Sequence, residues 1–249
     1  SSDQQLIGTW NADNNNRVAI DYNGLSPHLV HALVATEDER FYEHSGIDFI
    51  ALGRAVVKRG VMGQASAGGG STITQQLAKQ LFSEKAHSTV ERLLQKPIEW
   101  IIAVKLERHF TKEEILAMYF NYFDFLHNAV GVKRAANVYF DKEPRKLTVT
   151  EAAMLVGLCK NPSMFNPLRY PERCLQRRNV VLMQMVKSGY VTKSEYEELS
   201  QRPLGLHFTK SKPVSGAGDY FQAFLRQYMM AKKPERENYQ AWQNRQFVL

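Results

Sequence analysis

Two polar segments in the first third of the chain carry side chains that suit the transfer of a sugar. The first is the acidic cluster Glu37-Asp38-Glu39, and the second is a run of hydroxyl, amide and lysine residues from Gly70 to Lys79. An acceptor hydroxyl needs a carboxylate to take its proton, whereas a pyrophosphate leaving group needs cations and backbone N–H groups to hold its growing charge. Together the two segments predict glycosyl transfer from a phosphorylated donor.

The spacing within both segments follows known signature motifs. The first reads Glu-Asp, two residues, Phe, two residues, His, one residue and Gly, at Glu37, Asp38, Phe41, His44 and Gly46. The second is a nearly unbroken Gly-Ser-Thr-Ile-Thr-Gln-Gln-Leu run that ends in a basic residue. Both closely resemble the first two motifs of the peptidoglycan glycosyltransferases, glycosyltransferase family 51, which form the glycan-polymerising domain of class A penicillin-binding proteins. The resemblance extends from about Val30 to about Gly205.

This resemblance implies two catalytic carboxylates. Glu37 occupies the position of the general base, which takes the proton of the acceptor 4-hydroxyl. Glu99 matches a second glutamate near the reacting centre, in a third motif that keeps Lys96 but has Gln95 where the family has arginine. Taken alone, each glutamate has an ordinary structural explanation: Glu37 as a salt-bridged surface residue, and Glu99 as a first-turn residue that opposes a helix dipole.

The resemblance also implies a set of substrate-binding residues. Lys79 is expected to bind the donor pyrophosphate with Lys96 beside it, assisted by the N–H groups of a helix start. Arg92 or Lys85 could replace the phosphate contact of the missing arginine. The polar side chains expected to line or shape the cleft are Asp38, His44, Ser71, Thr72, Thr74, Gln75 and Gln76. Of these, the aspartate is expected to hold geometry and the histidine to be a hydrogen-bonded support.

Helical spacing of apolar residues predominates along the chain, and no sustained strand alternation occurs. Helices are expected over 29–35, 47–57, 71–81, 93–108, 111–121, 148–159 and 177–189. Thr111 and either Ser71 or Thr72 are expected as N-caps, and Pro97 in or near a first turn. The sequence predicts a mainly α protein, for which the resemblance implies a lysozyme-like helical lobe plus a smaller, membrane-proximal jaw subdomain. Leu126 replaces a family glycine, so the loop there is expected to differ in shape.

The composition changes after Pro203, where a stretch rich in Lys, Ser, Gly and Pro precedes an amphipathic segment. We assign 1–209 to a glycosyltransferase domain, and 210–249 to a linker and the start of a junction toward a transpeptidase domain that this sequence does not contain. No Ser-x-x-Lys sequence occurs, although penicillin-binding transpeptidases use this motif for their nucleophile.

Charge and cysteine content limit the partners. Lys and Arg number 32 against 25 for Asp and Glu, and the net charge of +7 favours polyanions or an anionic membrane surface. The two cysteines, Cys159 and Cys174, are expected to be small core residues. No stretch approaches the roughly 18 apolar residues that span a bilayer. The resemblance implies the extracytoplasmic face of the bacterial inner membrane (the periplasm), with an N-terminal anchor helix outside this sequence.

The implied reaction joins a growing glycan chain, carried on a lipid pyrophosphate, to the 4-hydroxyl of lipid II. It inverts C1 and releases undecaprenyl pyrophosphate. No cofactor is required, and since no Asp-x-Asp pair is present, a divalent cation (Mg or Mn) is at most accessory. Expected partners are lipid II, the lipid-linked glycan strand and the membrane surface, and not nucleic acid.

Two other functions remain open. A lysozyme-like muramidase or lytic transglycosylase also places two carboxylates across a sugar-binding cleft. A non-catalytic module could bind a membrane or nucleic acid through the net positive charge. Loss of activity in Glu37→Gln would distinguish an enzyme from the non-catalytic module. Lysines that bind a leaving pyrophosphate distinguish a transferase from a hydrolase, which has no use for them.

Overall fold

The computed structural model describes residues 18–60, 70–82 and 89–209, except the side chains of Val56, 58–60 and 89–94. Arg17–Lys210 form one compact unit. The predicted linker and junction at 210–249 lie outside the described residues, so the boundary at 209 stays a prediction.

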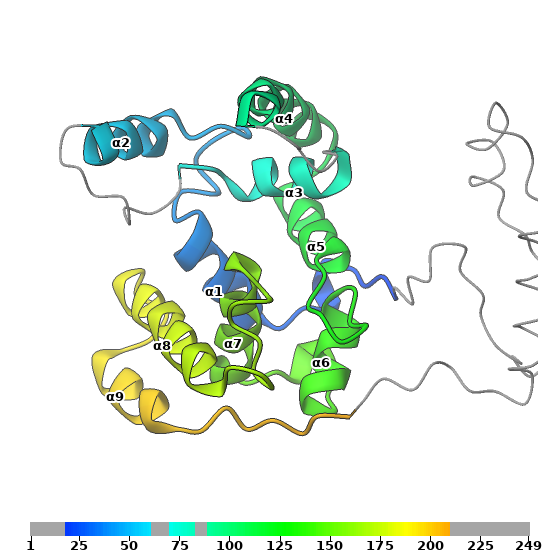
Figure 1. The fold of residues 1–249 in the computed structure, drawn as a ribbon, viewed down its shortest axis with the longest axis vertical. Helices are drawn as coiled ribbons and strands as arrows, with labels where there is room; N and C mark the ends of the chain where they lie inside the picture. Colours follow the sequence, from blue (N-terminus) through cyan, green and yellow to red (C-terminus); the bar gives the residue numbers. More distant parts are fainter. Residues whose placement is uncertain (1–17, 61–69, 83–88, 210–249) are drawn as a thin grey trace, which may run out of the picture. The chain divides into compact units, whose positions relative to one another are not determined.

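Within these ranges the chain is helical, apart from turns and one isolated β-bridge between Asp124 and Val130 (Figure 1). The helices are α1 (Pro27–Glu37), α2 (Phe49–Gly60), α3 (Ile73–Phe82), α4 (Thr89–His109), α5 (Lys112–Tyr122), α6 (Val132–Phe140), α7 (Val149–Lys160), α8 (Pro171–Lys187) and α9 (Lys193–Gln201). Short 3-10 helices precede α1 and α7, namely η1 (Tyr22–Gly24) and η2 (Pro144–Lys146). The prediction of a mainly α protein is confirmed.

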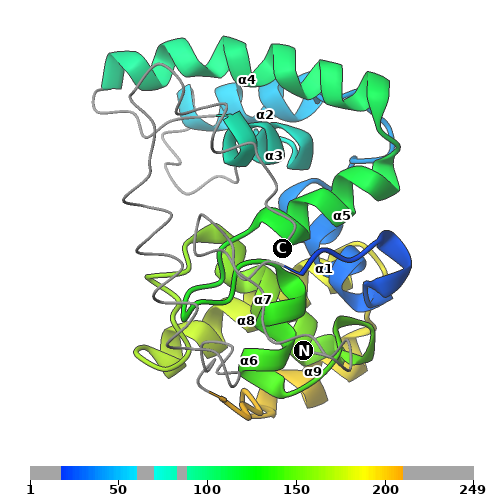
Figure 2. The same ribbon diagram turned by 90° about the vertical axis from the view of Figure 1, so that its right-hand side faces the viewer.

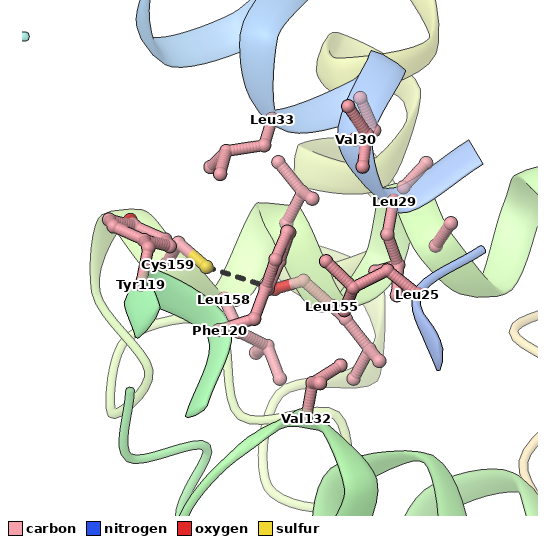
Figure 3. Close-up of a cluster of buried hydrophobic side chains, with 14 of the residues drawn as sticks. Leu25, Leu29, Val30, Leu33, Tyr119, Phe120, Val132, Leu155, Leu158 and Cys159 are labelled. Atoms are coloured by element: carbon pink, nitrogen blue, oxygen red, sulfur yellow. Dashed lines mark hydrogen bonds between the residues drawn. The ribbon is translucent and has the colours of Figure 1, made fainter. Parts of the chain in front are cut away.

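The main core lies where α1, α7 and α8 pack against one another. α7 is buried along most of its length, from Glu151 to Cys159. Leu29 of α1, Phe120 of α5 and Leu155 of α7 belong to one buried cluster (Figure 3). Burying an apolar side chain of this size contributes about 1.5–3 kcal/mol. The cluster therefore holds α1, whose last residue is Glu37, firmly in place.

A second group contains α2, α3 and α4. α3 packs on both α4 and α5, and Figure 2 shows the long α4 lying over α3. α5 also contacts α6 and contributes Ile115 and Phe120 to the core, so it joins the two groups. This arrangement agrees with the predicted larger lobe and smaller subdomain.

Both cysteines are buried and unpaired, as expected of core residues. Burial raises the pKa of the Cys159 thiol well above its usual range and that of Cys174 to about 12. Cys159 Sγ donates to the backbone oxygen of Leu155, at 3.6 Å (Figure 3). Neither thiol is therefore ionised near neutral pH.

Local capping explains where several helices begin. The predicted cap at Thr111 is confirmed as a capping box, because its Oγ1 accepts from the Glu114 N–H and the Glu114 carboxylate accepts from the Thr111 N–H. α2 begins at Phe49 because Asp48 Oδ1 accepts from the N–H groups of Ile50 and Ala51, at 2.9 and 3.0 Å.

Three helices begin earlier than predicted: α1 by two residues, and α4 and α8 by about a turn or more. α4 begins at Thr89, so Pro97 lies inside the helix and not near its first turn. α8 begins at Pro171 and not at Arg177, because proline at the first helical position has a backbone angle suited to a helix and needs no N–H there. The errors at α4 and α8 came from apolar spacing, which does not locate a polar first turn.

The loop between α5 and α6 contains three consecutive residues with left-handed backbone angles. The φ angles are +66° at Leu126, +52° at His127 and +62° at Asn128. Asparagine tolerates this region, but a leucine there brings its Cβ close to the following carbonyl oxygen. At Leu126, where the family has glycine, the predicted difference is therefore a strained backbone at a non-glycine residue.

Leu126→Gly is expected to raise the free energy of unfolding by about 1 kcal/mol, because relief of roughly 1–2 kcal/mol of strain exceeds the added chain entropy of glycine. Equilibrium denaturation measures the change. Leu126→Ala is the control, since alanine keeps the Cβ and should gain nothing. A glycine variant no more stable than the alanine variant would contradict the strain argument.

Candidate active site

Glu37, the last residue of α1, carries two side-chain contacts. Gln76 Nε2 donates to one carboxylate oxygen (3.0 Å) and Arg177 Nη2 to the other (3.5 Å). The side chain keeps 18% of its surface exposed, so a hydroxyl from outside can still reach it. Each carboxylate oxygen can accept about two hydrogen bonds, which leaves capacity for that hydroxyl.

A buried tyrosine fixes the direction of the Gln76 amide. Tyr119 donates its hydroxyl to Gln76 Oε1 at 3.1 Å. Burial raises the pKa of Tyr119 well above its usual range, so the phenol keeps its proton and remains a donor. With its oxygen engaged, the amide presents its nitrogen to Glu37. The sequence motif predicted Gln76 but gave no reason to add Tyr119.

Arg177 is a contact of Glu37 that the sequence reasoning missed. Its Nε donates to the backbone oxygen of Gly157 (3.5 Å), and a Cβ at Gly157 would lie only 3.2 Å from Arg177 Cγ. Burial lowers the pKa of Arg177, and the charge of Glu37 opposes that shift. Arg177 lies 140 residues from Glu37 in sequence, so only the packing of α8 on α1 and α7 reveals the pair.

Asp38 and His44 hold the loop after α1 against α3. Asp38 Oδ2 accepts from the Ile73 N–H and lies 3.0 Å from His44 Nε2. The Gly46 N–H donates to His44 Nδ1 (3.2 Å), so Nδ1 has no proton and Nε2 is the donor to Asp38. Asp38 is 7% exposed. The predicted geometric roles of Asp38 and His44 agree with these bonds.

Three polar residues predicted to line the cleft are buried. Thr72 donates to the backbone oxygen of Gly46 (2.7 Å), and Thr74 donates to Glu107 (2.6 Å). Thr72 and Gln75 exchange bonds across the first turn of α3, as a cap of that helix. The polar groups of Thr72, Thr74 and Gln75 are thus used within the protein, and substrate contact by these three residues stays a prediction.

The start of α3 was also expected to receive the leaving pyrophosphate. Its N–H groups at Ile73 and Gln75 already donate to Asp38 and Thr72, at 3.0 and 3.2 Å. A helix N-terminus attracts an anion through such N–H groups, so here the Asp38 carboxylate takes that place. Binding of the pyrophosphate by this helix start stays a prediction.

Gly46 allows the same loop to touch α4. Its φ is +96°, and a Cβ would lie 2.9 Å from the backbone carbon and oxygen of Ala103. Gly46→Ala is expected to lower the free energy of unfolding by about 2–3 kcal/mol, through overpacking and a left-handed backbone. Chemical denaturation measures this. Gly53→Ala is the matched control, since its Cβ would meet nothing within 4 Å. Equal stabilities of the two variants would contradict the close approach.

Lys96 and Glu99 lie three residues apart on α4. Lys96 Nζ donates to Glu99 Oε2 (2.8 Å) and to Ser71 Oγ (3.3 Å). Glu99 is 4% exposed, whereas the Lys96 side chain is 44% exposed. The first-turn explanation of Glu99 is excluded, because α4 begins at Thr89. The buried carboxylate therefore holds an ammonium group that other molecules can reach.

α3 connects the two halves of the site. Gln76 contacts Glu37, and Ser71, just before the helix, contacts Lys96. Lys79 is exposed and follows Gln76 by three residues, which places their side chains on neighbouring positions of one helix face. Arg92 belongs to α4, but its side chain lies outside the described residues. α3 thus carries Gln76 and Lys79. It contacts Glu37 of α1 through Gln76, and Ser71 just before it contacts Lys96 of α4.

Exposed apolar side chains occur on the helices of the smaller group. Phe49 and Ile50 of α2 are 70% and 59% exposed, and Ile98 and Ile101 of α4 are 57% and 59% exposed. Phe49 and Ile50 also line a cavity of about 410 Å³, together with Arg40, His44, Ser45, Ile47, Asp48 and Val104. Among the helices described, none has both the length and the apolar character to cross a bilayer.

Comparisons with known proteins show the family to which this chain is related. A family model described as Transglycosylase matches residues 3–186. Penicillin-binding protein 1A of Aquifex aeolicus is 41% identical over 93% of this chain and 30% of its own length. Penicillin-binding protein 1F of Bacillus subtilis is 38% identical over 85% of this chain and 29% of its own length. The chain thus spans under a third of the length of these relatives.

A solved structure supports the fold. The crystal structure of penicillin-binding protein 1A from Haemophilus influenzae aligns with a TM-score of 0.50 and 24% identity, over 95% of this chain and 24% of that protein. At that identity the likeness concerns the helical fold alone. From the matched family model and these relatives, the chain belongs to the transglycosylase family, glycosyltransferase family 51, which forms the glycosyltransferase domain of class A penicillin-binding proteins.

Proposed function

We propose that this chain is a peptidoglycan polymerase that transfers a lipid-pyrophosphate-linked glycan chain onto the 4-hydroxyl of lipid II. The observation that carries the proposal is the position of α3. Its Gln76 holds Glu37, its exposed Lys79 lies one turn further on, and Ser71 at its start contacts Lys96. A carboxylate for the acceptor and cations for a pyrophosphate are therefore available along the same helix.

In this mechanism Glu37 takes the proton of the acceptor hydroxyl. Gln76 and Arg177 orient its carboxylate, and the deprotonated oxygen attacks C1 of the donor sugar. The bond from C1 to the pyrophosphate breaks on the opposite face, which inverts the configuration from α to β. Proton removal by a positioned base contributes about 10²- to 10⁴-fold to a rate.

Departure of undecaprenyl pyrophosphate leaves negative charge that Lys79 and Lys96 neutralise. Glu99 orients the Lys96 ammonium and stabilises positive charge that develops on the donor sugar. Two lysines supply the charge that a metal ion would otherwise provide. We therefore propose a reaction that requires no cofactor, with Mg or Mn as an accessory at most.

Lipid-linked substrates place the reaction at a membrane surface. The exposed apolar residues of α2 and α4 suit contact with lipid. We propose the extracytoplasmic face of the bacterial inner membrane, an anchor helix outside this sequence, and a transpeptidase domain in the full-length protein. No nucleic-acid partner enters this proposal.

Incubation with purified, fluorescently labelled lipid II tests the proposal. We expect glycan polymer, visible as a ladder on a gel, and its loss when moenomycin is added as a donor-site inhibitor. Intact lipid II together with digestion of mature cell wall would favour a muramidase or lytic transglycosylase. Binding to vesicles with no change in either substrate would favour the non-catalytic module.

A further inference from the structure

The ammonium group of Lys112 lies where the supports of the site meet. Lys112 is in the first turn of α5, and its Nζ donates to the backbone oxygen of His44 (2.7 Å) and to Glu107 Oε1 (2.8 Å). The same Nζ lies 4.2 Å from the centroid of the Phe41 ring. Its side chain is 22% exposed, so most of it is enclosed by these partners.

On one side, Lys112 joins three helices through a single carboxylate. Glu107, near the end of α4, has a side chain only 5% exposed. Its Oε1 accepts from Lys112 of α5 and from Thr74 of α3, at 2.8 and 2.6 Å. A buried carboxylate depends strongly on its charged partner. The position of Glu107, and with it the end of α4, is therefore coupled to Lys112.

On the other side, Lys112 holds the loop that follows the general base. It binds the backbone oxygen of His44, and the ring of His44 donates to Asp38. Asp38 comes directly after Glu37 and also caps α3 through the Ile73 N–H. A displacement of His44 would therefore move Asp38 through their hydrogen bond, and Glu37 through the peptide bond that joins it to Asp38.

The two proposed catalytic glutamates lie on helices with different neighbours. α1, which carries Glu37, packs on α7 and α8, whereas α4, which carries Glu99, packs on α3 and α5. From these contacts we propose that Lys112 is a positioning residue, which sets the separation of Glu37 from Glu99 and Lys96 by tying the loop after α1 to α4. The inference rests on the proposed function, because the separation matters only if both halves act on one substrate pair.

Steady-state polymerisation of labelled lipid II by the wild type and by Lys112→Met tests this role. Moenomycin titration counts the folded sites in each sample. We expect kcat per site to fall by about 10- to 100-fold, as for a displacement of about 1 Å, with KM and moenomycin affinity changed less than about threefold. A purely structural role would lower the number of sites and leave kcat per site unchanged.

Lys112→Met leaves Glu107 buried without its cation and could prevent folding. The double variant Lys112→Met with Glu107→Gln removes that unpaired charge and is expected to show the same loss in kcat. Lys105→Met, the same change at an exposed lysine of α4, is the control and should leave kcat within about twofold.

Unchanged kcat per site in the double variant would overturn the positioning role, and so would a loss that merely follows the fraction of sites binding moenomycin. Absence of polymer from the wild type would instead overturn the proposed function. The two failures are therefore distinguishable.

Discussion

Glu37→Gln is expected to lower kcat for lipid II polymerisation by about 10²- to 10⁴-fold, because the amide cannot take a proton from the acceptor hydroxyl. The side chain keeps its size, and its oxygen can still accept from Arg177 or Gln76. The melting temperature should therefore change little. A continuous assay with labelled lipid II, run beside thermal denaturation, measures both quantities.

Glu39→Gln provides the matched control, since it makes the same change two residues further on, at an exposed side chain. Its kcat should stay within about threefold of the wild type. If the two variants polymerise equally well, Glu37 is not the base. If Glu37→Gln is inactive and unfolded, the experiment reports stability, which the melting curve will reveal.

The second large effect is on stability and concerns Arg178, a fully buried arginine on α8. Its guanidinium donates to four backbone oxygens at the end of α9 and just beyond, those of Leu199, Ser200, Arg202 and Pro203. Of these, the Leu199 oxygen also accepts from the Arg202 N–H, and the Ser200 oxygen also accepts from Asn179 Nδ2. The negative end of the helix dipole favours a cation there. One side chain thus fixes α9 to α8.

Arg178→Met is expected to lower the free energy of unfolding by about 3–5 kcal/mol, because methionine fills similar space but removes the donor of the Arg202 and Pro203 carbonyls and one donor from each of those of Leu199 and Ser200. Guanidinium denaturation measures the change. Arg173→Met on the same helix is the control: it is exposed and stacks on Tyr170 at 4.9 Å, so its loss should stay below about 1 kcal/mol. A similar loss in both variants would contradict the role of these hydrogen bonds.

Much of the fold followed from local patterns. The capping residue Thr111 identified a helix start because its side-chain bond forms within three residues. The starts of α4 and α8 were missed, since their first turns are polar and apolar spacing does not extend into them. Leu126 was recognised as unusual, but only the backbone angle of +66° showed that the departure is strain.

The candidate site divides in the same way. Motif spacing identified Glu37, Lys79, Lys96 and Glu99 as candidates, but it could not distinguish a side chain that faces a substrate from one that supports the loop. The polar groups of Thr72, Thr74 and Gln75 form hydrogen bonds within the protein. Residue type fixes which bonds a side chain can make, whereas burial decides which partner it meets.

By itself the sequence determined the family, the helical class and the acidic and basic groups available for the chemistry, because these depend on residue type and on spacing along one segment. Tertiary structure alone decided that Arg177 meets Glu37 across 140 residues and that Lys112 joins α5 to α4 and the loop after α1. Such contacts arise from helix packing, which brings together distant residues whose local sequence carries no sign of their partners.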